Sequence, residues 1–189
     1  MRTFFMHLLD NKKHIFLSIS ILLLLGYMFG FLWYSHTTDL FKEFFQYLFY
    51  FNDASYSNHY YLYLIQNGVF IILSTYLSTS FAGYPGSLFL IFLKGIQISY
   101  SSLFIFGQLD LSFHIIFLFL TELMLEVIFI YIISYMAINF SIYNLLITFY
   151  VKENFDFKLI INFILNYLIV CLVMLCILLL FRIYFVPLL

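Results

Sequence analysis

The sequence predicts an all-α, polytopic membrane protein with about five transmembrane helices and one amphipathic helix at the membrane interface. Of its 189 residues, 65% are hydrophobic and the mean hydropathy is +1.06. Only 9% are charged, whereas a soluble domain carries about 25%. Apolar runs of about 20 residues, the length that crosses a hydrocarbon core, recur along the chain. We expect one integral membrane domain over residues 1–189, with spans at about 15–34, 60–81, 87–106, 112–137 and 159–181.

The first apolar run, residues 15–34, follows a basic segment that contains Arg2, Lys12 and Lys13. A secretory signal peptide is one reading of this arrangement. The run is longer than the usual hydrophobic region of about 7–15 residues, however, and no small-x-small cleavage pattern follows Tyr34. We therefore expect an uncleaved first span whose amino terminus lies inside the cell.

Residues 39–51 predict an amphipathic helix. Polar side chains recur there at three- and four-residue spacing, opposite an aromatic and aliphatic face; they are Asp39, Lys42, Glu43 and Gln46. Such a helix lies in the outer interface of the membrane. The helix either offers a surface to a partner or to the cell envelope, or simply lies among the headgroups. Both readings stay open.

A charge-free run from Ala54 to Leu93 is long enough for two spans if something interrupts it. The segment Gly83-Tyr84-Pro85-Gly86 is expected to do so, because Pro85 lacks an N–H and disfavours helical dihedrals at the residue before it. We expect a turn there, between spans at 60–81 and 87–106. A re-entrant hairpin, covered by protein, is the competing geometry.

Small residues are spaced so that helices can approach closely. Two sets lie on the arms of the predicted hairpin and should pack these arms together; they are Ser74, Ser78 and Ala82 on the first, and Gly95, Ser99 and Ser102 on the second. Gly26 and Gly30 form a GxxxG motif in the first span. One such motif is equally compatible with chance and with a close helix contact.

The fourth span, 112–137, contains Glu122 and Glu126, which share a helix face because they are four residues apart. A polar connection is expected over residues 139–158, before the fifth span. Cys171 and Cys176 lie in that last span. They point about 140° apart on a helix, so we expect neither a disulfide nor a metal site.

Lys94 lies about 12 Å inside the third span, where an unpaired ammonium is costly. Counting residues from the inner helix ends puts Glu126 at a similar depth and Glu122 nearer the midplane, so we expect a buried Lys94–Glu126 pair. The two carboxylates either hold helices together or relay protons or bind a cation, and the sequence leaves both open.

No catalytic constellation is visible in the sequence. The five His residues lie near span ends or in loops, with no HExxH and no Cys/His ligand spacing. Gly-rich phosphate-binding loops are absent too. Eight Lys and Arg residues balance nine Asp and Glu residues, which argues against nucleic-acid binding. We expect no enzyme, no cofactor and no metal.

Over nearly its whole length the chain resembles the stage II sporulation protein M family of multi-pass membrane proteins. The resemblance is carried by motifs in the family's order: Gly26 and Gly30 in the first span, the short helix at Asp39–Phe45, Asn67 in the second span, Gly83 and Pro85 followed by Lys94-Gly95, and the closing Tyr184 and Pro187. Glu126 matches an acid that many members carry. The proline and polar pair that precede this acid in those members are missing here.

The resemblance implies a non-enzymatic subunit or scaffold in a bacterial cell membrane, with other membrane proteins as partners and homo-oligomers allowed. The short length and the altered fourth span favour the bacteriocin-associated members, which act with ABC transporters in maturation, secretion or immunity. The alternatives are a sporulation scaffold that recruits peptidoglycan-remodelling partners during engulfment, and a small transporter or channel that uses Glu122, Glu126 and Lys94.

Overall fold

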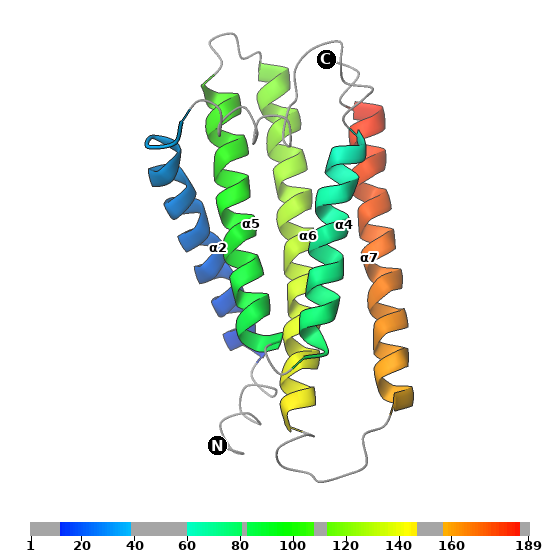
Figure 1. Ribbon diagram of the computed structural model, residues 1–189. Helices are drawn as coiled ribbons and strands as arrows, with labels where there is room; N and C mark the ends of the chain where they lie inside the picture. The colour runs from blue at the N-terminus through cyan, green and yellow to red at the C-terminus, as the bar shows by residue number, and fades with distance from the viewer. Residues whose placement is uncertain (1–11, 39–59, 81–82, 108–112, 147–156, 186–189) are drawn as a thin grey trace.

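Five long helices make up the described part of the chain, which the computed structural model covers at residues 12–38, 60–80, 83–107, 113–146 and 157–185 (Figure 1). The helices are α2 (Lys12–Tyr34), α4 (Tyr60–Ser78), α5 (Gly83–Phe106), α6 (Phe113–Leu146) and α7 (Phe157–Phe185). No strand occurs within these ranges. The protein is therefore all-helical where it is described, as the sequence predicts.

Successive helices run in opposite directions along one bundle. The helices α2, α5 and α7 begin at the lower end in Figure 1, whereas α4 and α6 begin at the upper end. We call the lower end the N-end of the bundle, because α2 begins there. An odd number of passes places the start of α2 and the end of α7 at opposite ends.

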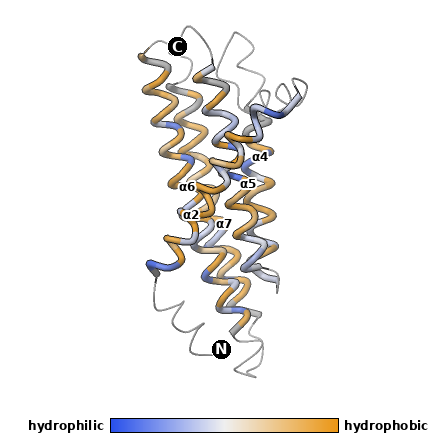
Figure 2. The backbone as a smooth tube through the Cα atoms, turned by 90° about the vertical axis from the view of Figure 1, so that its left-hand side faces the viewer, coloured by the Kyte–Doolittle hydropathy of each residue, from blue (hydrophilic) through white to orange (hydrophobic). Residues whose placement is uncertain are grey.

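Four helices are long and apolar enough to cross a membrane: Lys13–Tyr34 in α2, Gly83–Leu103 in α5, Ile116–Leu145 in α6 and Ile160–Phe181 in α7. The apolar part of α4, Leu64–Ser78, is shorter. Hydrophobic residues dominate all five helices, with isolated hydrophilic positions between them (Figure 2). The chain is thus a multi-pass membrane protein with four to five spans.

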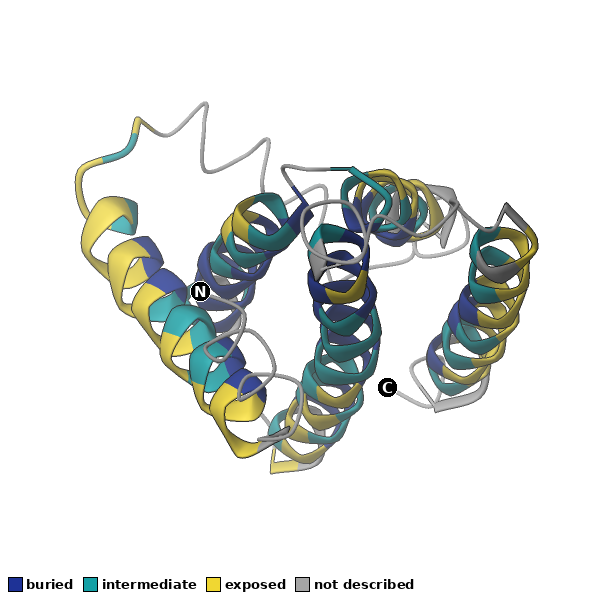
Figure 3. Ribbon diagram, turned by 90° about the horizontal axis from the view of Figure 1, so that it is seen from below, coloured by how far each residue is buried: buried dark blue, intermediate teal, exposed yellow. Residues whose placement is uncertain are grey.

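The outer faces of α2 and α7 are exposed, and their buried residues face the other helices (Figure 3). Only 22% and 17% of their apolar windows are buried, against 56% for α5. Exposed Leu, Ile and Phe side chains on a membrane helix need no protein partner, since lipid tails are as apolar as the side chains. α5 is therefore more enclosed than α2 or α7. The helices α2, α4 and α6 pack against it, whereas α7 packs on α6 and α4.

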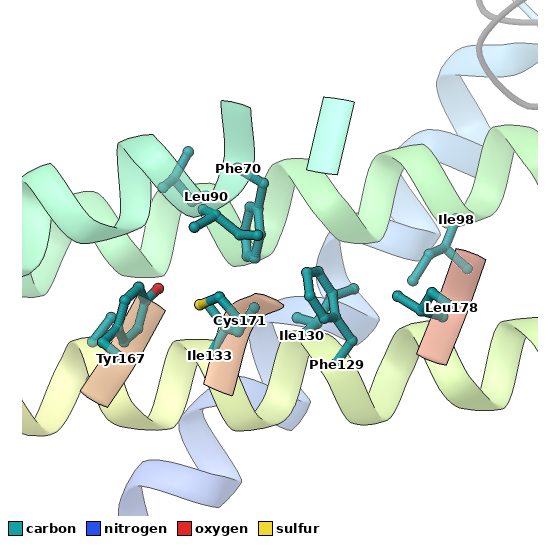
Figure 4. Packing of buried hydrophobic residues seen from close by; sticks show 11 residues of the cluster. Phe70, Leu90, Ile98, Phe129, Ile130, Ile133, Tyr167, Cys171 and Leu178 are labelled. Carbon is teal, nitrogen blue, oxygen red and sulfur yellow. The ribbon is translucent and has the colours of Figure 1, made fainter. Parts of the chain in front are cut away.

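The core of the bundle lies where α4, α5, α6 and α7 meet (Figure 4). Phe129, Ile130 and Ile133 of α6 are fully buried there, and Tyr167 of α7 is buried beside them. A second cluster joins the first half of α2 to α5 and α6; its buried members are Ile15, Ile19, Ile91, Ile138 and Ile142. These two clusters hold α5 and α6 between α2 on one side and α4 and α7 on the other.

The segment Gly83-Tyr84-Pro85-Gly86 is not the turn that the sequence predicts. It forms the first turn of α5, and the chain reverses just before it, after α4 ends at Ser78. Proline is tolerated in a first helical turn, because the N–H that it lacks has no intrahelical partner there. With 24 residues, α5 is about 36 Å long, and it crosses the bundle rather than turning back within it (Figure 1). The re-entrant geometry is therefore not adopted.

The helix that contains the predicted fourth span continues beyond residue 137. α6 continues to Leu146 and has 34 residues, so residues 139–146 are helical rather than part of a polar connection. Two of its polar residues there are buried: Ser141 is fully buried, and Asn144 is 8% exposed. Ser141 lies beside Gly83 at the start of α5, and Asn144 is hydrogen-bonded to Ser78 at the end of α4. The predicted amphipathic helix at 39–51 lies outside the described residues.

Candidate functional site

Lys94 lies in the middle of α5, eleven residues from the start of the helix at Gly83 and thus about 17 Å along it. Only 3% of the residue is exposed. Moving an ammonium out of water costs several kcal/mol unless it finds partners of opposite charge or good acceptors. Lys94 therefore needs such partners from the neighbouring helices.

Partners from two other helices surround the ammonium. Lys94 Nζ donates a 2.8 Å hydrogen bond to Asn67 Oδ1 on α4. It lies 3.6 Å from Glu126 Oε1 on α6 and 5.2 Å from the ring centroid of Phe70 on α4, within the range of a cation–π contact. We call Asn67, Lys94 and Glu126 the polar centre; it links α4, α5 and α6.

The two carboxylates of α6 differ in burial. Glu122 is 3% exposed, whereas 16% of the Glu126 side chain is exposed. The Oε1 atom of Glu126 is itself buried and accepts no hydrogen bond from the described residues. Its 3.6 Å separation from Lys94 Nζ exceeds the 2.7–3.2 Å of an N–H···O hydrogen bond. The ammonium is hydrogen-bonded to the amide, and its attraction to the carboxylate is purely Coulombic.

The GxxxG motif of α2 packs directly on α5. A Cβ at Gly30 would lie 2.9 Å from both the carbonyl oxygen of Ile96 and the Cβ of Ser99. A Cβ at Gly95 would lie 3.0 Å from the Cα of Gly26 and closer still to the carbonyl oxygen of Leu23. The backbones of α2 and α5 therefore touch through glycine. Gly95 and Ser99 face α2, not α4, so the expected packing of the two hairpin arms through them was wrong.

The glycines at the start of α5 make contacts of a different kind. A Cβ at Gly83 would meet the carbonyl oxygen of Leu77 and would lie 3.0 Å from the Cβ of Ser141 on α6. A Cβ at Gly86 would lie 2.7 Å from a methyl carbon of Leu77. Pro85 in the same turn is exposed. Gly83 and Gly86 therefore let the start of α5 pack closely against the end of α4, and Gly83 also packs against α6.

The structure brings together Lys94 and Glu126, which the sequence paired by depth, and adds Asn67. The sequence singled out Asn67 as polar but did not connect it with Lys94. A signal was present, because each residue lies eleven positions from the helix end next to the α4–α5 connection, which puts them at one level of a hairpin. Other buried polar residues were missed; they are Ser87, Gln97, Ser134, Ser141 and Asn144.

Chemically, the polar centre is a charge pair with an amide. The described side chains include no group of three or more His, Cys, Asp or Glu that could hold a metal ion. Both cysteines are free thiols, Cys171 buried and Cys176 exposed. The centre can bind three helices together, because its contacts come from α4, α5 and α6.

Comparison with family models, with curated proteins and with solved structures found no match for the chain. The resemblance to the stage II sporulation protein M family therefore stays a prediction from the motifs.

Proposed function

We propose that the chain is a non-enzymatic subunit or scaffold of a membrane complex. The observation that carries this proposal is the Lys94 ammonium held between α4 and α6, 2.8 Å from Asn67 Oδ1 and 3.6 Å from Glu126 Oε1. A cation that contacts two neighbouring helices fixes their register, because sliding any of them would leave it unpaired in the membrane. A fixed register is what a scaffold needs in order to present one surface to its partners.

We expect the partner to be an ABC-type exporter that acts in bacteriocin or peptide maturation, secretion or immunity. This expectation rests on the family resemblance. The proposed location is the cell membrane with the amino terminus in the cytoplasm. It is supported by Lys12, Lys13 and Lys158, which lie at the starts of α2 and α7 and thus at the same end of the bundle (Figure 1), since basic residues concentrate on the cytoplasmic side.

Purification from native membranes tests the proposal. A tagged chain, extracted in a mild detergent, should carry an ABC ATPase subunit with it. Recovery of peptidoglycan-remodelling proteins instead would favour the sporulation scaffold over the exporter subunit. A chain that is always recovered alone would contradict both. A second tagged membrane protein of similar size and abundance controls for nonspecific recovery.

A transporter or channel is the second candidate, favoured by three ionisable residues in the middle of the bundle: Lys94 and Glu122 are 3% exposed, and Glu126 lies beside Lys94. Ionisable side chains inside membrane segments often mark transport pathways. Proteoliposomes should then carry an ion flux that Glu126→Gln abolishes. Absence of flux from a correctly folded, reconstituted protein would contradict this candidate.

A further inference from the structure

Asn67 carries a buried N–H donor that the contacts of the polar centre do not use. The residue is fully buried, and its Oδ1 accepts the hydrogen bond of Lys94 Nζ. An ammonium can only donate, so the amide oxygen, and not the amide nitrogen, must face it. Nδ2, at the other end of the same amide, is buried and donates no hydrogen bond to the described residues. A buried donor without an acceptor is unfavourable, so this position calls for an acceptor.

Glu126 provides the complementary acceptor on α6. Its Oε1 atom is buried and accepts no hydrogen bond from the described residues. Lys94 Nζ lies 3.6 Å away, beyond the range of about 2.7–3.2 Å for an N–H···O hydrogen bond. At separations above about 3.5 Å, a water molecule can bridge two polar groups. One donor from α4 and one acceptor from α6 therefore lie beside the same ammonium.

The space that borders Glu126 lies inside the bundle. Of its side chain, 16% is exposed, against 4% for Lys94, and exposed area is area that a water molecule can touch. At about 100° per residue, Glu126 lies about 60° from Phe129, which is fully buried. Met124 and Ile128, which are 67% and 49% exposed, lie about 160° away from Glu126 in either direction. This space is thus between helices, and not on the surface of α6 that faces lipid.

Only a group that both accepts and donates can satisfy the two atoms together. An anion would accept from Asn67 Nδ2 but would be repelled by the Glu126 carboxylate, and a cation would be repelled by the Lys94 ammonium. A water molecule accepts through its lone pairs and donates through its hydrogens. Buried water typically makes about three hydrogen bonds, and the ammonium, which has three N–H groups, can supply the third.

We propose that the polar centre binds one buried water molecule, which accepts a hydrogen bond from Asn67 Nδ2 and donates one to Glu126 Oε1. The water joins α4 to α6 directly, whereas the Lys94 ammonium joins them through α5. The proposal does not depend on which partner the chain binds. Co-purification tests the scaffold and the experiments below test the water, so either can fail alone.

A crystal structure of the wild-type chain grown from a lipidic phase, at a resolution that shows ordered water, tests the proposal directly. We expect a density peak about 2.7–3.2 Å from both Asn67 Nδ2 and Glu126 Oε1. Ordered water elsewhere on the chain with none at this position would overturn the proposal, as would a protein acceptor for Asn67 Nδ2. A peak that bromide replaces, located by its anomalous scattering, would overturn it too, because the ligand would then be an anion.

Radiolytic labelling locates bound water in native membranes without a crystal. X-rays convert water to hydroxyl radicals, which add to an adjacent aromatic ring, and mass spectrometry locates the added oxygen. The ring centroid of Phe70 lies 5.2 Å from Lys94 Nζ, so this ring should gain oxygen in the wild-type protein. Asn67→Leu should lower the gain severalfold, and the matched Asn144→Leu, which removes a buried amide elsewhere on the bundle, should not. Equal labelling of Phe70 in the wild-type and Asn67→Leu proteins would contradict a water bound by Asn67.

Discussion

The two sides of α5 hold their neighbours by opposite means. Toward α2, the contact is made by Gly95 and Ser99 against Gly26 and Gly30, and the two backbones touch. Toward α4 and α6, the contact includes the buried Lys94 with its amide and carboxylate neighbours. Gly95 directly follows Lys94, so one step along the helix, about 100° of rotation, separates the two kinds of interface.

The difference between the sides lies in which change each can tolerate. The α2 side depends on the absence of side-chain atoms, because dispersion forces between close backbones replace the hydrophobic effect in lipid. The polar side depends on the presence of particular atoms, because a lost partner leaves a buried charge uncompensated. Added atoms should therefore break the first interface, and deleted atoms the second.

The largest effect is expected from deleting the ammonium. Lys94→Met leaves the Glu126 carboxylate without its cation and Asn67 Oδ1 without its donor, and should destabilise the protein by about 3–5 kcal/mol. The level of protein in the membrane and its thermal unfolding in detergent measure this loss. The double variant Lys94→Met with Glu126→Leu should recover most of it, because no charge is then left buried. A double variant as unstable as the single one would show that the pair is not what Lys94 stabilises.

A bulky side chain at Gly95 tests the other side of α5. Gly95→Leu would force atoms against the backbone of α2 at Leu23 and Gly26, and we expect a loss of about 3 kcal/mol, at the upper end for overpacking. Gly68→Leu is the matched control, because a Cβ at Gly68 has no neighbour within 4 Å. It should not destabilise the protein, since Leu favours a helix more than Gly does. An equal loss of stability at both positions would contradict the close α2 contact as the cause.

The sequence predicted the spans well and their ends poorly, for a physical reason. An apolar run of sufficient length specifies a membrane helix almost by itself. The ends depend on where polar groups find partners in the fold. Pro85 was taken as a helix breaker, yet it is tolerated in the first turn of α5. Ser141 and Asn144 were taken as part of a polar connection, yet they are buried in α6, beside the start of α5 and the end of α4.

In the candidate site, too, some features could be predicted from the sequence and others depend on contacts in the fold. Charge and depth suffice to suggest that Lys94 and Glu126 belong together. Asn67, a neutral amide, gives no electrostatic signal in a sequence, although its hydrogen bond to Lys94 is the shorter contact. The partner of the GxxxG motif could not be predicted either. Gly95 can face α2 or α4 with equal ease, and only the packing of the whole bundle decides between them.

Removing the amide measures how much the Asn67–Lys94 hydrogen bond contributes to the unfolding free energy. Asn67→Leu leaves the Lys94 ammonium with Glu126 at 3.6 Å and without its 2.8 Å acceptor. A hydrogen bond to a charged group contributes about 1.5–3 kcal/mol, so we expect a loss of about 2 kcal/mol in unfolding free energy. In the background of Lys94→Met the same change should have little effect. Additive losses in this double-mutant cycle would contradict a direct contribution of the Asn67–Lys94 contact.

The smallest effect is expected at the N-end of the bundle, where a deleted partner is less costly. Asn144 Nδ2 donates a 3.2 Å hydrogen bond to the carbonyl oxygen of Ser78, in the last turn of α4, where carbonyl groups lack intrahelical donors. Asn144→Ala should lower the unfolding free energy by about 1 kcal/mol, which thermal unfolding in detergent measures. Both groups of the Asn144 bond are neutral and lie at a helix end, so headgroups and water can replace the lost donor there as they cannot at Lys94. A loss at Asn144 as large as that of Lys94→Met would show that position along the bundle, and not charge, sets how much a deleted contact costs.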